Sequence, residues 1–394
     1  MKIGMILDKN FPPDPRVENE ALSLVKAGHD ISLFCLGSRN ETFNYKGISV
    51  FRFKQSVFDY KMGALAYEFP YYNWKLSLEI KDFIKNSKVE VLHIHDIRPA
   101  GAVYKANKEF QLPCVLDLHD NYPEIMQYYP HYKKFPGNVL IQPKLWKKAE
   151  GKYIRKSKRV ISVSPEFIKD LKMRFPDQEG KFILVPNSIR RSFYQEAVLD
   201  KKLVSRLKEN YTLLYLGDTG LRRGLLTAIE SVAILKNTIP KIKLVIVGSN
   251  STDQILKDKA IELGCEDQVE FAGWRDVSLF PSYISGAQIG LSPLLRNVQH
   301  DVAYANKIFQ YMGFEKPVIA SDCPAQAKLI EQNKAGLVYT AGDAQELAKS
   351  VIELYDNKEK ATILGKNGFN FIDQEFCWEE SSKKLIELYA SFNH

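Results

Sequence analysis

The sequence has few cysteines, and their distribution excludes a disulfide framework. Cys35, Cys114, Cys265, Cys323 and Cys377 lie far apart among 394 residues, and none stands at the short spacing of paired metal ligands. Several fall in apolar runs, where a reduced thiol behaves as a small core residue. We therefore expect five free thiols in a protein that is made and kept in the cytoplasm.

Long hydrophobic runs and low-complexity tracts are also missing from the sequence. No window approaches the roughly 20 consecutive apolar residues of a membrane span, and the apolar run at the N-terminus is too short for a signal peptide. Hydrophobic residues make up 45% and charged residues 26% of the chain, which favours a globular protein over disorder. At about 150 residues per domain, this length predicts two domains.

Positive charge is concentrated in residues 131–159, although the formal net charge of +8 is modest for this length. The segment holds ten Lys or Arg and one acidic residue, Glu150, interleaved with aromatic and aliphatic residues. Two interpretations remain open. The segment forms a basic amphipathic surface that rests on anionic lipid at the inner face of the membrane, or it is a solvated helix face with a buried aromatic side. Because no recognition motif accompanies the charges, we expect no nucleic-acid partner.

Strand-like and helix-like segments alternate along most of the chain. Short β-rich runs predict a first set of strands at residues 2–7, 31–36, 89–94, 114–117, 160–163 and 182–185, and a second set at 212–216, 243–247, 269–271, 289–292, 317–321 and 336–338. Helical patterns separate several of these strands. Such alternation indicates βαβ units and parallel sheets. We predict an α/β fold of two doubly wound, Rossmann-like domains.

We place the boundary between the two domains after the turn VPNS, ahead of a polar, charge-rich stretch. Residues 1–190 form the first predicted domain and residues 191–375 the second. Residues 376–394 carry apolar side chains at near-helical spacing, and we expect this helix to pack back on the first domain. Ligands of doubly wound sheets bind beyond the carboxyl ends of the strands, so two facing sheets would form one cleft.

Residues 300–322, HDVAYANKIFQYMGFEKPVIASD, combine a predicted helix start with a predicted buried strand. Asn306 and Lys307 stand in the first helical turn, where unpaired backbone N–H groups attract anions. Gln310 follows one turn later and could face a sugar hydroxyl. The pattern is typical of a cradle for a diphosphate, and equally of an ordinary amphipathic helix with a solvated lysine.

Polar side chains of the first domain follow the ends of predicted strands. His119, flanked by Asp117 and Asp120, could transfer a proton or orient a hydroxyl, or it could be a structural histidine. His93 and His95 would point the same way on one strand. The H-x-H spacing alone is weak, and no third ligand is evident, so we expect no metal.

Glycines and arginines occupy the corresponding strand ends of the second domain. Gly217 begins the stretch GDTGLRRGLL, in which Arg222 and Arg223 reach the start of a helix. Paired guanidinium donors suit an anionic ligand. Gly248 and the pair Gly273-Trp274 end the next two strands. Small residues there would admit a nucleotide base, although ordinary turns use glycine just as freely.

Taken together, these features resemble the GT-B glycosyltransferases of the large retaining family 4. The similarity covers nearly the whole chain, from FPPDPRVENEALSLVKAGHDIS through VISVS and VPNS to NKIFQYMGFEKPVIASD and FCWEE. It implies metal-independent, retaining transfer of a sugar from a nucleotide diphosphate donor, linked to UDP or GDP. No resident cofactor is implied. The first domain would bind the acceptor and the second the nucleotide sugar.

The resemblance also implies roles for individual residues. Arg223 would neutralise the leaving diphosphate, Lys307 would hold its oxygens, and His119 would orient the transferred sugar near the reacting centre. Further donor contacts would come from Gly217, Arg222, Gly248, Trp274, Ala303, Tyr304, Ala305, Asn306 and Gln310. Acceptor contacts would come from Asp14, Arg16, Asp120 and Glu124.

The chain departs from the family's signature of two glutamates separated by seven residues. Val302 and Gln310 occupy these positions. The amide of Gln310 can still form a hydrogen bond with a ribose hydroxyl. Val302 offers no polar side chain, so its role would fall to Asp301, to His300 or to main-chain amides.

A second departure follows Gly217, where the family often has a basic residue and this chain has Asp218 and Thr219. Arg222 would compensate. The sequence thus predicts a glycosyltransferase that extends a surface glycan and uses a saccharide or lipid-linked saccharide as acceptor. Two alternatives remain: a non-catalytic subunit that binds a nucleotide sugar or a partner, which the missing glutamates favour, and a nucleotide-sugar epimerase of the same fold.

Overall fold

The computed structural model describes residues 1–67, 70–128, 132, 135 and 137–392, which form two compact units. The N-terminal unit comprises Met1–Pro186 and Ser382–His394, and the C-terminal unit comprises Asn187–Ser381. The first break lies a few residues before the predicted boundary at 190. The chain rejoins the N-terminal unit at Ser382, whereas the sequence analysis placed the start of the returning segment at residue 376.

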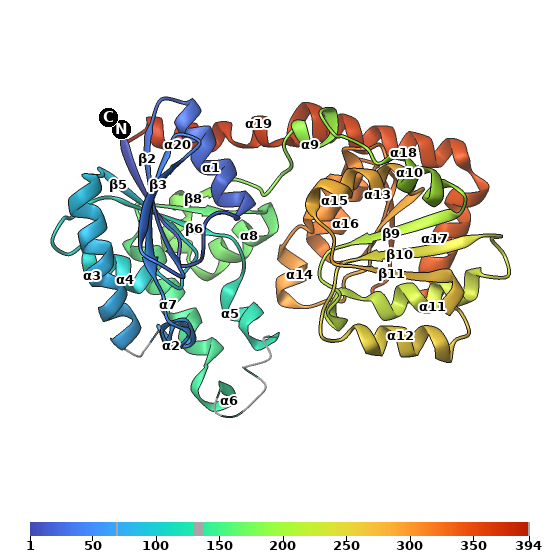
Figure 1. The fold of residues 1–394 in the computed structure, drawn as a ribbon, viewed down its shortest axis with the longest axis horizontal. Coiled ribbons are helices and arrows are strands. Elements are labelled where there is room, and N and C mark those ends of the chain that lie inside the picture. Colours follow the sequence, from blue (N-terminus) through green and yellow to red (C-terminus); the bar gives the residue numbers. More distant parts are fainter. Residues whose placement is uncertain (68–69, 129–131, 133–134, 136, 393–394) are drawn as a thin grey trace. The chain divides into compact units, whose positions relative to one another are not determined.

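The N-terminal unit is built on an eight-stranded sheet with the order β3-β4-β2-β1-β5-β6-β7-β8 (Figure 1). Its strands are β1 (Lys2–Ile6), β2 (Asp30–Gly37), β3 (Glu41–Tyr45), β4 (Ile48–Lys54), β5 (Val91–His95), β6 (Cys114–Leu118), β7 (Arg159–Ser162) and β8 (Phe182–Leu184). Neighbouring strands pair in parallel, except that β3 and β4 form an antiparallel hairpin. The sequence analysis missed this hairpin. Its strands are half-exposed at the sheet edge and lack a continuous apolar run.

The helices of the N-terminal unit lie mostly between successive strands. They are α1 (Pro15–Lys26), α2 (Val57–Met62), α3 (Pro70–Ser87), α4 (Ala100–Ala106), α5 (Tyr122–Ile125), α6 (Gly137–Leu140), α7 (Pro143–Lys156), α8 (Pro165–Arg174) and, from the end of the chain, α20 (Lys383–Ala390). Both β5 and β6 are buried along their whole length, as expected for strands covered on both faces. α20 packs against α1, which gives the C-terminal helix the apolar surface that its sequence requires.

The C-terminal unit contains six parallel strands in the order β11-β10-β9-β12-β13-β14 (Figure 1). They are β9 (Tyr211–Leu216), β10 (Ile242–Val247), β11 (Val269–Gly273), β12 (Ile289–Ser292), β13 (Val318–Ser321) and β14 (Gly336–Tyr339). Numbered within this unit, the order is 3-2-1-4-5-6, the arrangement of a Rossmann fold. The order of the strands changes direction between β9 and β12: β10 and β11 follow on one side of β9, and β12, β13 and β14 follow on the other. The two predicted α/β domains are therefore confirmed.

Alternation along β9 divides the core of the C-terminal unit between the two faces of the sheet. Leu213 and Tyr215 pack with one group of helices, and Leu214 and Leu216 pack with another. The helices of this unit are α9 (Ser192–Gln195), α10 (Lys201–Lys208), α11 (Leu225–Leu235), α12 (Asp253–Glu262), α13 (Phe280–Gly286), α14 (Val298–Val302), α15 (Asn306–Met312), α16 (Pro324–Gln332), α17 (Ala344–Asp356), α18 (Lys358–Phe371) and α19 (Trp378–Ser381). The helices that pack with Leu213 and Tyr215 include α11 and α17. Those that pack with Leu214 and Leu216 include α13 and α15.

Candidate functional site

Two glycines bring the loops after β9 and β10 into direct contact. Gly248 has a φ of +144°, and a Cβ atom there would lie 1.9 Å from the carbonyl oxygen of Gly217. Only glycine permits this approach. At Gly217 itself, a Cβ atom would point towards the Lys307 ammonium, 3.7 Å away. The end of β9 is therefore an uncrowded backbone beside a lysine, at the point where the strand order reverses.

Arg222 and Arg223 lie in a 3₁₀ turn between this loop and α11. The turn ends at Gly224 in the left-handed conformation, where a Cβ atom would collide with the carbonyl oxygen of Pro293. This contact presses the turn against the end of β12. Nε of Arg223 donates a hydrogen bond to Oδ2 of Asp218 at 3.2 Å. The turn thus places two guanidinium groups at the same strand ends as the glycine loop.

Lys307 lies in the first turn of α15 with only 9% of its surface exposed. Its Nζ atom stands 3.3 Å from the centre of the Tyr215 ring, a cation–π contact. In the described part of the chain, no carboxylate forms an ion pair with this ammonium group. Burial, with a smaller contribution from Arg223, holds the pKa of Lys307 well below its ordinary value. An anion that reached Lys307 would therefore gain a strong partner.

His300 positions Arg222. Its Nδ1 lies 2.8 Å from the carbonyl oxygen of Leu295, and its Nε2 lies 3.0 Å from Nη1 of Arg222. Burial lowers the pKa of His300 to about 4, so the ring is neutral at physiological pH. Nδ1–H then donates to Leu295, and Nε2 accepts from the guanidinium. The His300 side chain is buried and both of its ring nitrogens have partners, which favours this positioning role over contact with a sugar hydroxyl.

The remaining donor residues predicted from sequence line the same region with different exposure. Ala303, Tyr304 and Ala305 connect α14 with α15 and are partly buried. The Tyr304 ring packs edge-on against Phe309, with ring centres 5.6 Å apart. Asn306 is exposed, so it faces away from the core that buries the neighbouring Lys307.

Three other residues singled out in the sequence of the C-terminal unit are Gln310, Val302 and Trp274. Gln310 is half-buried on α15, and Val302 is the last residue of α14. Trp274 follows β11 and is 70% exposed. The backbone N–H of Gly248 donates to the carbonyl of Gly273 at 2.8 Å, which joins the turn before Trp274 to the glycine contact.

In the N-terminal unit, Arg16 is buried rather than open to an acceptor. Its guanidinium donates to both oxygens of Asp117 at 3.1 and 2.8 Å and pairs with Glu20 at 2.9 Å. It also donates to the carbonyl oxygen of Val185. With all these donors engaged and 5% of its surface exposed, Arg16 organises the ends of β6 and α1. These contacts give Arg16 a structural role, and its contact with an acceptor stays a prediction.

His119 follows β6, and both of its ring nitrogens face carboxylates. Nε2 lies 2.8 Å from Oδ2 of Asp117, and Nδ1 lies 3.7 Å from Oδ2 of Asp96. Burial opposes protonation, but these two carboxylates outweigh it and raise the pKa of His119 to about 9. At neutral pH, His119 is therefore an imidazolium.

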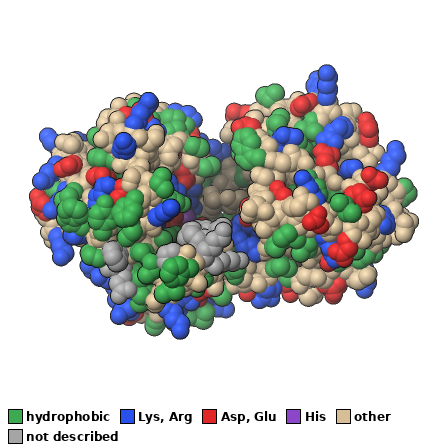
Figure 2. Space-filling view, turned by 60° about the horizontal axis from the view of Figure 1, so that its bottom comes forward, with side chains coloured by type: hydrophobic (Ala, Val, Ile, Leu, Met, Phe, Trp, Pro, Cys, Tyr) green, Lys and Arg blue, Asp and Glu red, His purple; other side chains and the backbone are tan. Residues whose placement is uncertain are grey.

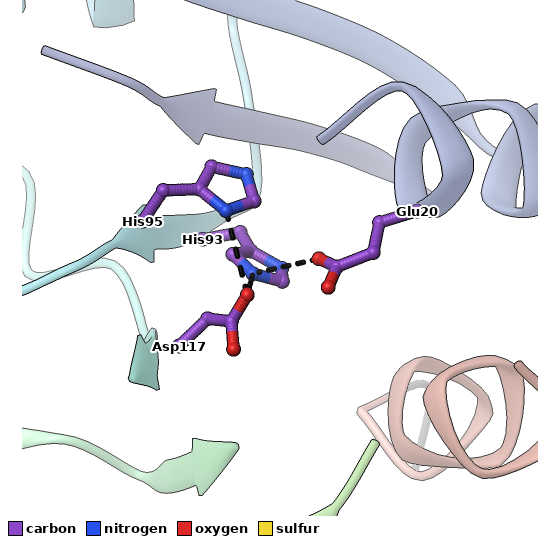
Figure 3. A group of neighbouring side chains, drawn as sticks. All are labelled: Glu20, His93, His95 and Asp117. Atoms are coloured by element: carbon purple, nitrogen blue, oxygen red, sulfur yellow. Dashed lines mark ion pairs between the residues drawn. The ribbon is translucent and has the colours of Figure 1, made fainter. Parts of the chain in front are cut away.

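Two histidines and two carboxylates form a fully buried group next to His119 (Figure 3). Nε2 of His93 lies 3.3 Å from Oε2 of Glu20 and 3.6 Å from Oδ2 of Asp117, and Nδ1 of His95 lies 3.5 Å from the same Asp117 oxygen. The sequence analysis found no third ligand beside the two histidines, whereas the fold supplies Glu20 and Asp117.

This group has the residue types of a metal site, but its charges are already matched internally. The Arg16 guanidinium neutralises Asp117, whose pKa it holds well below the ordinary range against the effect of burial. Burial raises the pKa of Glu20 to about 8, so this acid carries a proton at neutral pH. We therefore describe the four residues, together with Arg16 and His119, as an ion-pair network.

The three other predicted acceptor residues lie around the loops after β1 and β6. Asp14 accepts a hydrogen bond from the Val17 N–H and caps α1. Asp120 is exposed. Glu124 is buried in α5, accepts a hydrogen bond from Gln127 and pairs with Lys147. This ion pair weakens the prediction that Glu124 meets an acceptor, whereas Asp14 and Asp120 stay predictions.

The basic segment, residues 131–159, includes 131, 133, 134 and 136, which lie outside the described residues. Trp146, Tyr153 and Ile154 on α7 are buried in the core, so the aromatic side of α7 is structural. Phe135, Val139 and Leu140 are exposed, with 84% of Phe135 accessible. None of the helices that the structure describes combines the length and apolar character needed to cross a bilayer.

Comparison with known families gives this architecture an identity. Residues 199–371 match the model described as glycosyl transferases group 1, and residues 16–193 match the model described as glycosyltransferase family 4. These two matches, with the two Rossmann-like units, support a group 1 glycosyltransferase of the GT-B fold. The predicted fold is thereby confirmed, and the predicted family is supported by both models.

Several proteins are similar to this chain over nearly its whole length. Phosphatidyl-myo-inositol mannosyltransferase of Mycolicibacterium smegmatis is 22% identical over 407 aligned positions, which cover 99% of this chain and 94% of the relative. Sucrose-phosphate synthase from Thermosynechococcus elongatus superimposes with a TM-score of 0.79 at 17% identity, covering 100% and 99% of the two chains. HepE from Anabaena, solved with UDP, gives 0.74 at 16% identity, covering 99% and 100%.

The matches differ in how much of each relative they cover. The two curated relatives that match first are aligned over 46% and 48% of their own length, so the chain spans about half of each. The structural similarities, all at low identity, show the fold.

Sequence reasoning missed three residues that shape the two regions. Glu20 stands four residues after Arg16 on α1, and this spacing is the signal that could have paired them. Asp117 was noted only as a neighbour of His119. Tyr215 lies on the strand before Gly217, and no local pattern indicates that its ring lies under Lys307.

Proposed function

We propose that this glycosyltransferase moves a sugar from a nucleoside diphosphate donor to a saccharide or lipid-linked saccharide, with retention at the anomeric carbon and without a metal ion. The observation that carries the proposal is the cluster of Arg222, Arg223 and Lys307 beside the glycine loop at the end of β9. Two guanidinium groups, together with a lysine that a bound anion would protonate, match the charge of a diphosphate. Small backbone at the same place leaves room for it.

In the proposed reaction, the bond between the anomeric carbon and the diphosphate oxygen breaks, and its electron pair stays with the diphosphate. Arg223 and Lys307 stabilise the negative charge that develops there. The oxygen of the acceptor hydroxyl then attacks the anomeric carbon from the face that the diphosphate leaves. The leaving phosphate oxygen accepts the proton of this hydroxyl. This route needs no protein base, in keeping with the absence of acids at Val302 and Gln310.

His119 suits an orienting role better than a role as general base. Its pKa of about 9 keeps the ring protonated at neutral pH, so it has no lone pair with which to take a proton. Its positive charge can instead favour a sugar oxygen near the reacting carbon. Asp117 and Asp96 hold the ring in place for this task.

The donor base is proposed to be uracil or guanine. HepE, which has the same fold, was solved with UDP, and this supports a nucleoside diphosphate in general. Gln310 is proposed to bind a ribose hydroxyl, because its amide can donate or accept. Trp274 lies exposed beside Gly273, where the main chain is proposed to meet the base.

The first test is binding followed by transfer. A thermal-shift screen with UDP, GDP, ADP and CMP should raise the melting temperature with one of them. The matching nucleotide sugar should then release free nucleoside diphosphate only when an acceptor saccharide is added, and prior dialysis against EDTA should not change the rate. Lys307→Ala and Arg223→Ala should each lower transfer at least 100-fold while the protein stays folded. Lys366→Ala, an exposed lysine on α18, serves as the control. Unchanged transfer in both site variants would overturn the assignment.

The same experiment separates the two alternatives. A non-catalytic subunit, which Val302 and Gln310 in place of the family's glutamates favour, would bind the nucleotide sugar but release no diphosphate with any acceptor. An epimerase would convert one nucleotide sugar into another without net release of diphosphate. Release that depends on an acceptor contradicts both.

We also propose that the N-terminal unit rests on anionic membrane, which places the enzyme in the cytoplasm and peripheral to the inner face. Exposed Lys144, Lys148 and Lys152 lie on α7, near the exposed apolar residues Phe135 and Val139. Figure 2 shows hydrophobic and Lys or Arg side chains together on the face of this unit that carries α2 and α6 in Figure 1. Such a surface combines apolar insertion with attraction to anionic lipid.

Flotation with vesicles tests the membrane proposal. The protein should float with vesicles that contain phosphatidylserine at low salt, and less well at high salt, because surface charges are screened. Val139→Asp should reduce flotation. The control Val198→Asp, at an exposed position of the C-terminal unit, should not. Failure of the unmodified protein to float at low salt would contradict the proposal.

A further inference from the structure

Asp218 follows Gly217 directly and places a carboxylate among the cations of the same loop. Its Oδ2 lies 3.2 Å from Nε of Arg223 and 3.9 Å from Nη2 of Arg222. Its Oδ1 accepts hydrogen bonds from Nδ2 of Asn250 at 2.6 Å and from the backbone N–H of Gly220 at 3.3 Å. One carboxylate thus engages two guanidiniums, an amide and a backbone N–H.

These partners keep Asp218 ionised. Burial opposes ionisation, but the hydrogen bond from Asn250 and the charge of Arg223 prevail and lower the pKa of the carboxyl below its ordinary value. Among the residues that the structure describes, Asp218 is the carboxylate with which Arg223 forms an ion pair. The negative charge is therefore permanent at neutral pH and stands at the centre of the cationic cluster.

The donors around Asp218 are those that a phosphate uses. Guanidinium groups and backbone N–H groups bind carboxylate and phosphate oxygens with the same geometry. Arg222 is also held by His300, whose Nε2 lies 3.0 Å from Nη1 of the guanidinium. Lys307 forms no ion pair with Asp218 in the described part of the chain, and its Nζ lies over the Tyr215 ring. The carboxylate therefore occupies part of the anion site and leaves part of it open.

We propose that Asp218 is an internal competitor of the diphosphate, which orders the two arginines while the site is empty and weakens the binding of the nucleoside diphosphate product. This inference rests on the proposed function. A nucleoside diphosphate carries about one more negative charge than the nucleotide sugar, because its terminal phosphate is no longer esterified. A fixed carboxylate a few ångströms away repels the product more strongly than the donor. Asp218 thus makes the site prefer the nucleotide sugar to the nucleoside diphosphate, and this preference favours product release.

The test measures the affinities of UDP and GDP by titration calorimetry for the full chain and for Asp218→Asn. The variant should bind the nucleoside diphosphate about tenfold more tightly, and the corresponding nucleotide sugar by a smaller factor. The gain should shrink in 0.5 M salt. Product inhibition should strengthen in the same proportion. A merely structural role of Asp218 predicts the opposite, namely weaker binding after substitution.

Three further variants complete the design. Glu331→Gln, which removes the same charge at an exposed position on α16, should leave all affinities unchanged. Asp218→Glu, which keeps the charge, should restore product affinity to about the wild-type value. Asp218→Ser repeats the measurement if the Asn variant does not fold. Equal or weaker product binding in the charge-removing variants overturns the role of Asp218. If neither the wild type nor these variants bind any nucleoside diphosphate, the proposed function itself fails.

Discussion

The hydroxyl of Tyr389 lies 2.7 Å from Nδ1 of His93, although 296 positions separate the two residues in the sequence. Tyr389 belongs to α20 and His93 to β5, and both are fully buried. Burial lowers the pKa of His93, so the ring is neutral. If Nδ1 accepts from the hydroxyl, Nε2 carries the proton and points at Glu20 and Asp117. The last helix of the chain thereby fixes a tautomer inside the ion-pair network.

Tyr389→Phe should weaken the N-terminal unit without emptying its core. The substitution leaves the ring in place and removes one buried hydrogen bond, which should lower the free energy of unfolding by about 1–2 kcal/mol. Urea unfolding of the full chain measures the loss, and nitrogen NMR of the imidazoles should show a change in the His93 tautomer. Tyr355→Phe, at a half-buried tyrosine of the C-terminal unit, is the matched control. Equal stability of the Tyr389 variant and the wild type would show that the hydroxyl contributes nothing.

Stability should fall as pH rises above neutrality because of His119. Its pKa is about 9 in the folded protein and about 6.5 in the unfolded chain. The folded state therefore holds the proton more tightly, and this contribution is complete below pH 6.5 and disappears as pH approaches 9. The shift corresponds to about 3 kcal/mol, and Glu20, with a raised pKa of about 8, acts in the same direction. Urea unfolding at pH 6 and pH 9 should show the loss. His119→Gln should flatten it, and an unchanged slope in that variant would contradict the assignment.

Binding of a nucleoside diphosphate should be accompanied by uptake of a proton at Lys307. Its pKa is depressed in the empty site by burial and by Arg223, and a bound anion raises it again. At a pH between the pKa of Lys307 in the empty site and its pKa in the complex, binding takes up a proton. Affinity therefore falls as pH rises from the first pKa to the second. Titration with UDP or GDP at pH 8 in buffers of different ionisation enthalpy measures the uptake. Lys307→Arg, whose side chain stays charged, should bind without it. Equal uptake in both proteins would assign the proton elsewhere.

Gly248→Ala should disrupt the glycine contact after β9. The added Cβ atom would lie 1.9 Å from the carbonyl oxygen of Gly217, at a φ of +144° that side chains rarely adopt. We expect a loss of about 2–4 kcal/mol in the free energy of unfolding and loss of nucleoside diphosphate binding. Gly180→Ala, where no atom lies within 4 Å of the new Cβ, should change stability by less than about 0.5 kcal/mol. Similar behaviour of the two variants would refute the role of close approach.

The elements around residues 300–322 could be predicted because their signals are local. The apolar run at 289–292 is the strand Ile289–Ser292, and the helix predicted after Ala305 is Asn306–Met312. Both β12 and β13 are buried on two faces, so they show uninterrupted apolar residues between polar ends. The β3–β4 hairpin escaped prediction for the opposite reason, since its strands are only partly buried and lack a continuous apolar run.

Side-chain roles were harder to predict than elements. The sequence predicts Arg16 as a loop cation near an acceptor. The fold buries its side chain against Asp117, 101 positions away. His300 reads as a possible sugar contact, yet it holds Arg222 across 78 positions. Pairings over such distances leave no periodicity in the sequence, because they arise only when separate strands end at the same edge of a sheet.

The sequence by itself determined the α/β fold class, the two Rossmann-like units and the residue types of the loop after β9, because local patterns of apolar and polar residues specify strands and helices. Only the tertiary structure decided which charges meet. It placed Asp218 against Arg222 and Arg223, the Lys307 ammonium over Tyr215, and His119 between two carboxylates. The physical reason is that burial and ion pairing depend on distances in space, and these set the protonation of each group.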